Sequence, residues 1–246
     1  MTVVIVTGAS RGIGKAITDI LLNDPSTKVL AVARNEDPLT NLKIKYGEDR
    51  VATLAGDVSQ ENTVKEIIEL AISRFGSIDA IVANAGVLNP VDKVENANLT
   101  EWKELFNINF FSIVSLVANA LPHLRNSKGR VVLVSSGAST KGYVTSKAAL
   151  NHYAIQLSSE EKDISVISVA PGVVDTQMQI DIREKFGKNM TPEALKRFTD
   201  LKSNHELLDP IVPATIYANL ASKGFDKELN GKYLRYNDPL LESYSV

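Results

Sequence analysis

Short apolar runs alternate with helical patterns along most of the chain, and this alternation restricts the folds open to it. The runs are nearly continuous in Val, Ile, Leu and Ala, which is typical of strands covered on both faces. They predict strands over residues 3–6, 28–33, 51–57, 78–86, 130–136 and 164–172. Apolar residues at helical spacing predict helices over 14–24, 63–75, 101–124 and 143–161. Crossovers of this kind require a parallel, doubly wound α/β sheet with helices on both faces.

We expect one domain over residues 1–246, because no repeat, low-complexity tract or linker interrupts the pattern. The region from about 175 to 225 is helical and more polar. Insertions near the carboxyl ends of strands usually shape the ligand site of such a sheet. This region is therefore predicted to form the substrate pocket.

Charge and composition exclude several partners. Twenty-seven basic and twenty-nine acidic residues give a net charge of −2, which offers no electrostatic basis for binding nucleic acid or anionic membrane. There is no cysteine, and the three histidines lack ligand spacing, so no metal is expected. No stretch approaches the ~18 unbroken apolar residues of a membrane span, and no leader pattern is present. These features predict a cytoplasmic protein.

The glycine-rich stretch TGASRGIGK, residues 7–15, directly follows the first predicted strand. Its spacing is Gly8-x-x-x-Gly12-x-Gly14. A nucleoside triphosphate loop needs G-x-x-x-x-G-K-[ST], but Ala16 follows Lys15 here, so triphosphate hydrolysis is disfavoured. The common dinucleotide spacing G-x-G-x-x-G is not matched either. A glycine turn before a helix N-terminus suits a pyrophosphate, and it equally suits a tight turn without a ligand.

Further motifs follow this turn in a fixed order. They are GDV at 56–58, NAG at 84–86, Asn109, VSS at 134–136, Tyr143-x-x-x-Lys147 and PGVVDT at 171–176. With them the chain resembles the short-chain dehydrogenase/reductase family from residue 2 to about 176. VANAGVL, SKAALNH and GKYLRYNDP resemble the fungal branch near benzil reductases and sepiapterin reductases.

This resemblance implies a single Rossmann-type domain with about seven strands. It also implies an NADPH-dependent carbonyl reductase that acts on a small ketone or a benzil-like α-diketone. Family members are usually homodimers or homotetramers. The alternative is a non-catalytic dinucleotide-binding regulator on the same fold. Intact Ser136, Asn109, Tyr143 and Lys147 argue against that alternative. A Rossmann-like methyltransferase would have no use for the Tyr/Lys pair.

Tyr143 and Lys147 are spaced i and i+4, so both project from one helix face. A nearby ammonium favours the phenolate and is expected to lower the tyrosine pKa from about 10. The resemblance makes Tyr143 the acid/base and gives Lys147 both this electrostatic role and the cofactor ribose. An isolated Y-x-x-x-K is more often an exposed surface pair.

Ser136 ends a predicted strand, where an open α/β sheet presents its crevice. Its hydroxyl could donate to the substrate oxygen, with Ser135 and Ser139 as less favoured candidates. The other interpretation is a strand-end hydrogen bond. The resemblance places Asn109 as the amide that holds a water in a proton relay behind Lys147. Otherwise Asn109 is a polar residue satisfied by the backbone.

The other cofactor contacts are implied by the resemblance. Asp57 and Val58 would contact the adenine, although Asp57 or Ser59 could instead cap a helix. Asn84 would also tie neighbouring strands together. Val174 and Thr176 would hold the nicotinamide carboxamide, although Pro171-Gly172 just before them could equally be a plain turn. The predicted cofactor-binding residues are Gly8, Ser10, Arg11, Gly12, Ile13, Gly14, Arg34, Asp57, Val58, Asn84, Ala85, Gly86, Tyr143, Lys147, Pro171, Gly172, Val174 and Thr176.

NADPH is favoured over NADH. A site that prefers NAD usually has an acid after the second strand, but Ala33 and Arg34 stand there. With Arg11 from the glycine turn, Arg34 could clamp a 2′-phosphate. Glu36 and Asp37, just beyond, count against this interpretation.

Only the six residues GASTKG separate Ser136 from Tyr143, where relatives usually carry a longer segment. Three interpretations are open. The short segment leaves a naturally open pocket, it was shortened by engineering, or some of its residues are missing from the recorded sequence. Because both flanks match the family pattern in full, the third interpretation is favoured. It predicts an interrupted backbone near Thr140–Lys141.

Overall fold

The computed structural model describes residues 1–137 and 141–246, which contain a seven-stranded sheet. The strand order is β3-β2-β1-β4-β5-β6-β7, and every neighbouring pair is parallel. The strands are β1 Thr2–Thr7, β2 Thr27–Ala33, β3 Val51–Ala55, β4 Ala80–Ala83, β5 Arg130–Val134, β6 Ser165–Ala170 and β7 Tyr233–Arg235. The predicted doubly wound parallel sheet is confirmed.

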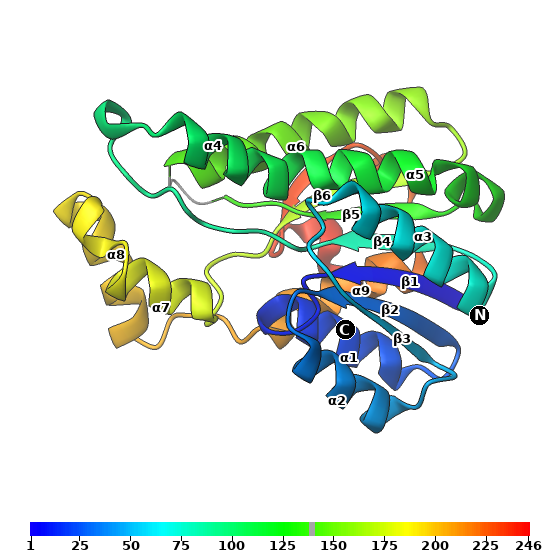
Figure 1. Ribbon diagram of the computed structural model, residues 1–246. Coiled ribbons are helices and arrows are strands. Elements are labelled where there is room, and N and C mark those ends of the chain that lie inside the picture. The colour runs from blue at the N-terminus through cyan, green and yellow to red at the C-terminus, as the bar shows by residue number, and fades with distance from the viewer. Residues whose placement is uncertain (138–140) are drawn as a thin grey trace.

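Helices cover both faces of this sheet, with α3, α5 and α6 on one face and α1, α2 and α9 on the other (Figure 1). The helices are α1 Gly12–Asn23, α2 Glu36–Tyr46, α3 Glu61–Phe75, α4 Leu99–Phe106, α5 Ser112–Ser127, α6 Lys141–Glu160, α7 Gln177–Glu184, α8 Pro192–Ser203 and α9 Ile211–Lys223. Short 3₁₀ turns span Val94–Asn96, Gly187–Asn189, Lys227–Leu229 and Pro239–Tyr244.

The apolar runs of the strands are buried because they feed two cores. In β1, Val4 and Val6 pack toward α1 and α9, while Val3 and Ile5 pack toward α3 and α5. All four side chains are fully buried. Alternate residues of a strand point to opposite faces, so a strand between two helix layers needs an apolar residue at every position.

The predicted helix over 101–124 is not continuous. It consists of α4 and α5 joined by a π-helical turn, Asn107–Phe111. The whole stretch Leu99–Ser127 is long and apolar enough to cross a membrane by length and composition alone. However, one side of α5 packs into the core between the sheet and its neighbouring helices, through Ile113, Leu116 and Val117. Such packing is typical of a core helix.

The carboxyl ends of the central strands meet at one edge, and β1 and β4 are neighbours there although the chain leaves them in opposite directions. Ligands bind at such a switch point in open α/β sheets. Helices α7 and α8 project from this edge (Figure 1). Residues 173–175 and Leu208 pair there, with Asp175 N donating to Leu208 O at 2.8 Å and Leu208 N donating to Val173 O at 2.9 Å.

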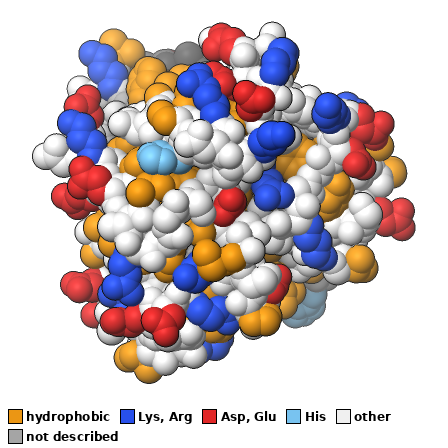
Figure 2. Space-filling view, turned by 90° about the vertical axis from the view of Figure 1, so that its right-hand side faces the viewer, with side chains coloured by type: hydrophobic (Ala, Val, Ile, Leu, Met, Phe, Trp, Pro, Cys, Tyr) orange, Lys and Arg blue, Asp and Glu red, His pale blue; other side chains and the backbone are white. Residues whose placement is uncertain are grey.

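Acidic and basic side chains are interspersed over the face shown in Figure 2, without a large field of one sign. This agrees with the net charge of −2. An even mixture of charges provides no electrostatic footprint for a polyanion on that face.

Candidate active site

A cavity of about 510 Å³ opens at the carboxyl edge of the sheet. Its wall combines the glycine turn, the ends of β2, β4, β5 and β6, the start of α6 and much of α7. Every predicted cofactor-binding residue lines it, and so does Ser136. Asn109 stands behind this wall and is fully buried. The structure therefore brings the separate sequence motifs together around one space.

The glycine turn, which runs from the end of β1 into the first turn of α1, needs glycine at three positions. Gly8 and Gly12 have φ values of +68° and +53°, which side chains rarely adopt. A Cβ on Gly14 would lie 2.2 Å from the Gly8 carbonyl oxygen and 2.4 Å from Asn84 Nδ2. The backbone can thus approach a phosphate closely, and the N-terminus of α1 offers free N–H groups to it.

Asn84 joins the ends of β1 and β4, as predicted. Its Nδ2 donates to Thr7 O at 2.9 Å and to Gly8 O at 3.2 Å. The Thr7 hydroxyl accepts from the backbone N–H groups of Asn84 and Ala85, each at 3.1 Å. These bonds fix the glycine turn against the next strand and thereby shape the cavity floor.

Tyr143 and Lys147 lie one turn apart on α6 and form one group with Ser136. Lys147 is 1% exposed, and its Nζ donates to Val134 O at 2.8 Å. Its Nζ lies 5.8 Å from the centre of the Tyr143 ring. The side chain of Ser136 hydrogen-bonds to Tyr143. A hydroxyl, a phenol and an ammonium therefore meet at the cavity wall.

Burial determines the pKa values of this pair. It lowers the pKa of Lys147 to about 8, because the ammonium loses hydration. It raises the pKa of Tyr143 to about 12, and the hydrogen bond with Ser136 offsets part of that rise. The expected lowering of the Tyr143 pKa by Lys147 was therefore wrong for this structure, since desolvation raises that pKa and the partial lowering comes from Ser136. Tyr143 is consequently protonated at neutral pH.

Asn109 lies in the π-helical turn and connects three parts of the site. Its Oδ1 accepts from Val87 N at 2.8 Å, and its Nδ2 donates to Val87 O at 2.9 Å and to Ser146 Oγ at 3.1 Å. The Ser146 hydroxyl donates to Tyr143 O at 2.7 Å. A Cβ on Gly86 would lie 3.3 Å from Asn109 Oδ1 and 3.5 Å from Lys147 Nζ. The amide thus fixes the loop after β4 against α6.

Of the two serines considered as alternatives to Ser136, only Ser135 lies in the described part of the chain. Ser135 is fully buried and donates to Asn151 Oδ1 at 2.7 Å, and Ser168 donates to the same oxygen at 2.6 Å. Ser135 thus joins β5, β6 and α6 and does not line the cavity. Ser139 and the predicted interruption near Thr140 lie outside the described residues.

Arg34 lines the far end of the cavity together with Asn35 and Pro38. Glu36 and Asp37 begin α2 and are not part of this wall. Asp57 also lines the cavity, and its Oδ1 accepts from Ser59 N at 2.9 Å and from Ser59 Oγ at 2.8 Å.

The helix-capping role considered for Asp57 or Ser59 was wrong. Helix α3 begins at Glu61, and Gln60 occupies the cap position. The Asp57 carboxylate instead closes a turn with Ser59, which holds it at the end of β3.

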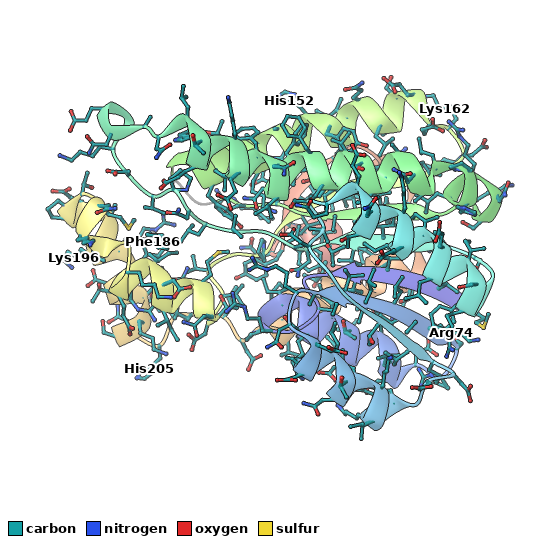
Figure 3. The ribbon with its side chains drawn as sticks, viewed as in Figure 1. Arg74, His152, Lys162, Phe186, Lys196 and His205 are labelled. Atoms are coloured by element: carbon teal, nitrogen blue, oxygen red, sulfur yellow. The ribbon has the colours of Figure 1, made fainter. Side chains whose placement is uncertain are left out.

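Another part of the cavity wall is apolar, and the residues Leu88, Met178, Ile182 and Phe198 that line it were not identified from the sequence. Leu88, Val91, Ile182 and Phe198 form a small buried cluster. Tyr143, Val173, Met178, Phe186 and Met190 pack against it. The i, i+4 pair of Met178 and Ile182 was the available signal within the predicted substrate region. Figure 3 shows Phe186 within the projecting α7–α8 segment.

No group of three or more metal-ligating side chains occurs in the described part of the chain. His152 on α6 and His205 after α8 lie far apart (Figure 3). The structure thus contains no histidine cluster at these positions, and the predicted absence of a metal stays a prediction.

The sequence model of the short chain dehydrogenase family matches residues 2–187. The chain belongs to this family. It is 50% identical over 250 aligned positions to the uncharacterized oxidoreductase YIR035C of Saccharomyces cerevisiae, covering 98% of both chains. It is 46% identical over 255 positions to a benzil reductase ((S)-benzoin forming) of the same organism, covering 97% of both.

Solved structures agree with this short-chain dehydrogenase fold. The crystal structure of YIR035C has a TM-score of 0.98 and 49% identity, with full coverage of both chains. A cytoplasmic protein of unknown function from Saccharomyces cerevisiae has a TM-score of 0.87 and 48% identity, also with full coverage. L-sorbose reductase from Gluconobacter frateurii, complexed with NADPH and L-sorbose, has a TM-score of 0.81 and 25% identity, covering 98% of this chain and 97% of its own.

Proposed function

We propose that this oxidoreductase reduces a small ketone or α-diketone with NADPH, with Tyr143 as the proton donor. The observation that carries the proposal is that Ser136, Tyr143 and Lys147 line one cavity together with the glycine turn. Tyr143 also packs against the apolar cluster that contributes to the same wall. The 46% identity to a benzil reductase supports a dicarbonyl substrate.

The residues present fit a nicotinamide dinucleotide. The glycine turn and the N-terminus of α1 would hold the pyrophosphate, Asp57 and Val58 the adenine, and Val174 and Thr176 the carboxamide. Arg34, with Arg11, would bind the 2′-phosphate that distinguishes NADPH, and Glu36 and Asp37 stand outside the wall. When bound, the cofactor supplies the hydride.

The chain's own groups would provide the proton. Because its pKa is about 12, Tyr143 holds its proton at neutral pH and can transfer it from Oη to the carbonyl oxygen as negative charge develops there. The Ser136 hydroxyl would donate a hydrogen bond to the same oxygen. Lys147 would place positive charge beside the phenol and bind the ribose. Asn109 would support a proton relay behind Lys147.

The direct test is NADPH oxidation, followed by absorbance, with a panel of monoketones and α-diketones. The proposal expects turnover with aromatic diketones and a marked preference for NADPH over NADH. A regulator that only binds the dinucleotide would bind NADPH without oxidising it with any member of the panel.

We also propose a cytoplasmic protein that forms a homodimer or homotetramer and has no nucleic-acid, membrane or metal partner. The near-neutral charge and the 48% identical cytoplasmic yeast protein support this assignment. Phe111, on the π-helical turn, is 55% exposed, and such a large apolar side chain suits a subunit contact.

A further inference from the structure

Gln179 is a buried amide on α7, next to Met178 of the apolar cluster. It is 7% exposed and lines the cavity from α7. Its Oε1 is enclosed and has no hydrogen-bond partner in the part of the chain that the structure describes. Buried polar atoms are nearly always hydrogen-bonded, because an unmet one loses its hydration without compensation. The described residues therefore leave a hydrogen bond of this amide unmade, and its place in the cavity wall makes that bond available to a group that enters the cavity once the amide turns toward it.

The helix itself does not need this amide. The backbone N–H of Gln179 already donates to Thr176 O at 2.9 Å, as an ordinary first-turn bond. Gln177 provides a comparison on the same helix: it is exposed, and its Nε2 donates to Asp181 Oδ1 at 3.2 Å. Both glutamines line the cavity, but the Gln177 amide is satisfied within α7, whereas the Gln179 Oε1 has no partner among the described residues.

The position of Gln179 relates it to the reacting group. Its neighbours on α7, Met178 and Ile182, pack in the same apolar cluster as Tyr143. A ketone that accepts a proton from Tyr143 would lie against this cluster. A polar substituent close to the reacting carbonyl would then come within reach of an amide on the cavity wall.

We propose that Gln179 determines specificity by binding the oxygen on the carbon next to the reacting carbonyl. This inference rests on the proposed ketone reduction. A primary amide suits both ends of a dicarbonyl reduction: Nε2 can donate to the second carbonyl of the diketone, and Oε1 can accept from the hydroxyl of an α-hydroxyketone. An apolar side chain in its place would accept a simple ketone equally well. The substrate class is therefore a vicinally oxygenated ketone.

The experiment compares benzil with deoxybenzoin, which has the same skeleton without the second oxygen. In Gln179→Leu, kcat/KM for benzil is expected to fall about tenfold, as for one lost hydrogen bond, while that for deoxybenzoin stays nearly unchanged. Gln179→Glu keeps the size but cannot donate when ionised, so it should lose benzil selectively too. Gln156→Leu removes an exposed amide on α6, away from the cavity wall, and is the matched control that should change neither. NADPH affinity, measured by fluorescence, verifies that each variant is folded.

Three results would overturn the inference. An equal loss for both ketones would mean that Gln179 serves packing alone. Weaker NADPH binding with an unchanged ratio of the two ketones would place the amide on the cofactor. Arg183 lies one turn further along α7, and its Nη1 is also enclosed without a partner. If Arg183→Met reproduced the selective loss, the amide would act through Arg183. A wild-type protein that reduced neither ketone would refute the proposed function itself, whereas the first three results leave it intact.

Discussion

Lys147 donates a 2.8 Å hydrogen bond from Nζ to the carbonyl oxygen of Val134, where β5 ends at the cavity. A strand-end carbonyl therefore orients the ammonium, although burial lowers its pKa from 10.5 to about 8. The Val134 carbonyl fixes the position of the ammonium, and the pH determines whether Lys147 carries its charge. The charge state of Lys147 can therefore be followed through the pH dependence of the free energy of unfolding.

The first prediction concerns stability and pH. Below pH 8 the folded and unfolded chains both carry the Lys147 proton, whereas between pH 8 and 10.5 the folded chain has released it and the unfolded chain retains it. The free energy of unfolding should therefore gain on the order of 3 kcal/mol from this residue across that window. Denaturant unfolding at several pH values compares the wild type with Lys147→Met, which should lack this gain. Parallel curves would mean that Lys147 titrates normally in the fold.

The second prediction concerns the proton donor. Tyr143→Phe should reduce ketone turnover by ~10²–10⁴-fold, because the variant loses the hydroxyl and keeps the ring. NADPH affinity should be nearly unchanged. Steady-state kinetics at neutral pH and a fluorescence titration measure the two quantities. Near-wild-type turnover in the Phe variant would exclude Tyr143 as the acid.

The third prediction concerns the choice of cofactor. Arg34→Asp should weaken NADPH binding by about tenfold or more, because a carboxylate replaces a charged hydrogen-bond donor to the 2′-phosphate. NADH, which lacks that phosphate, should bind almost as before. Lys65→Asp makes the same charge change on the exposed face of α3, away from the cavity, and is the control. Equal losses for NADPH and NADH in Arg34→Asp would contradict the assignment.

The fourth prediction concerns the glycine turn. Gly14→Ala should abolish tight NADPH binding and lower the Tm, because its Cβ would lie 2.2 Å from a backbone oxygen. Gly76→Ala is the comparison: its φ is +81°, but no atom stands within 4 Å of the new Cβ. That variant should lose some stability through backbone strain and keep its NADPH affinity. Undiminished NADPH binding by Gly14→Ala would show that the turn does not hold the cofactor.

The fifth prediction concerns assembly. Phe111 is 55% exposed and packs edge-on to Phe110, with ring centres 5.3 Å apart. Phe111→Asp should shift a dimer or tetramer toward the monomer, because a charge would be buried against the partner. Light scattering after gel filtration gives the mass of each form. A wild-type protein that already runs as a monomer at micromolar concentration would contradict the predicted homo-oligomer.

The sequence predicted the sheet well because its central strands are covered on both faces and are therefore apolar at every position. Helix α2 was missed, since Leu39 and Leu42 are its buried residues and most of its other positions are polar or charged. The π-helical turn around Asn109 was also missed, because a π turn has no apolar repeat of its own. The predicted strands over 78–86 and 164–172 end sooner, at Ala83 and Ala170, where the chain turns to line the cavity.

The candidate site was likewise predicted from the sequence only in part. Short motifs located the glycine turn and the Tyr143 group, because their roles depend on local spacing. The apolar wall could not be found like this, since Leu88, Ile182 and Phe198 lie far apart in the sequence and meet through the tertiary fold. The Tyr143 pKa was misjudged for a related reason: the sequence showed the nearby ammonium but not the burial that raises the pKa.

The pairing of residues 173–175 with Leu208 brings together the two ends of the segment that contains α7 and α8. Lys202 adds an ion pair to Asp175 at 3.0 Å near the same junction. A segment whose two ends are held together can change in length at little cost, because the entropy of loop closure rises only slowly with the number of residues in the loop. Under the proposed function, exchange of this segment as a unit would change the substrate range, while the glycine turn and the Tyr143 group stay as they are.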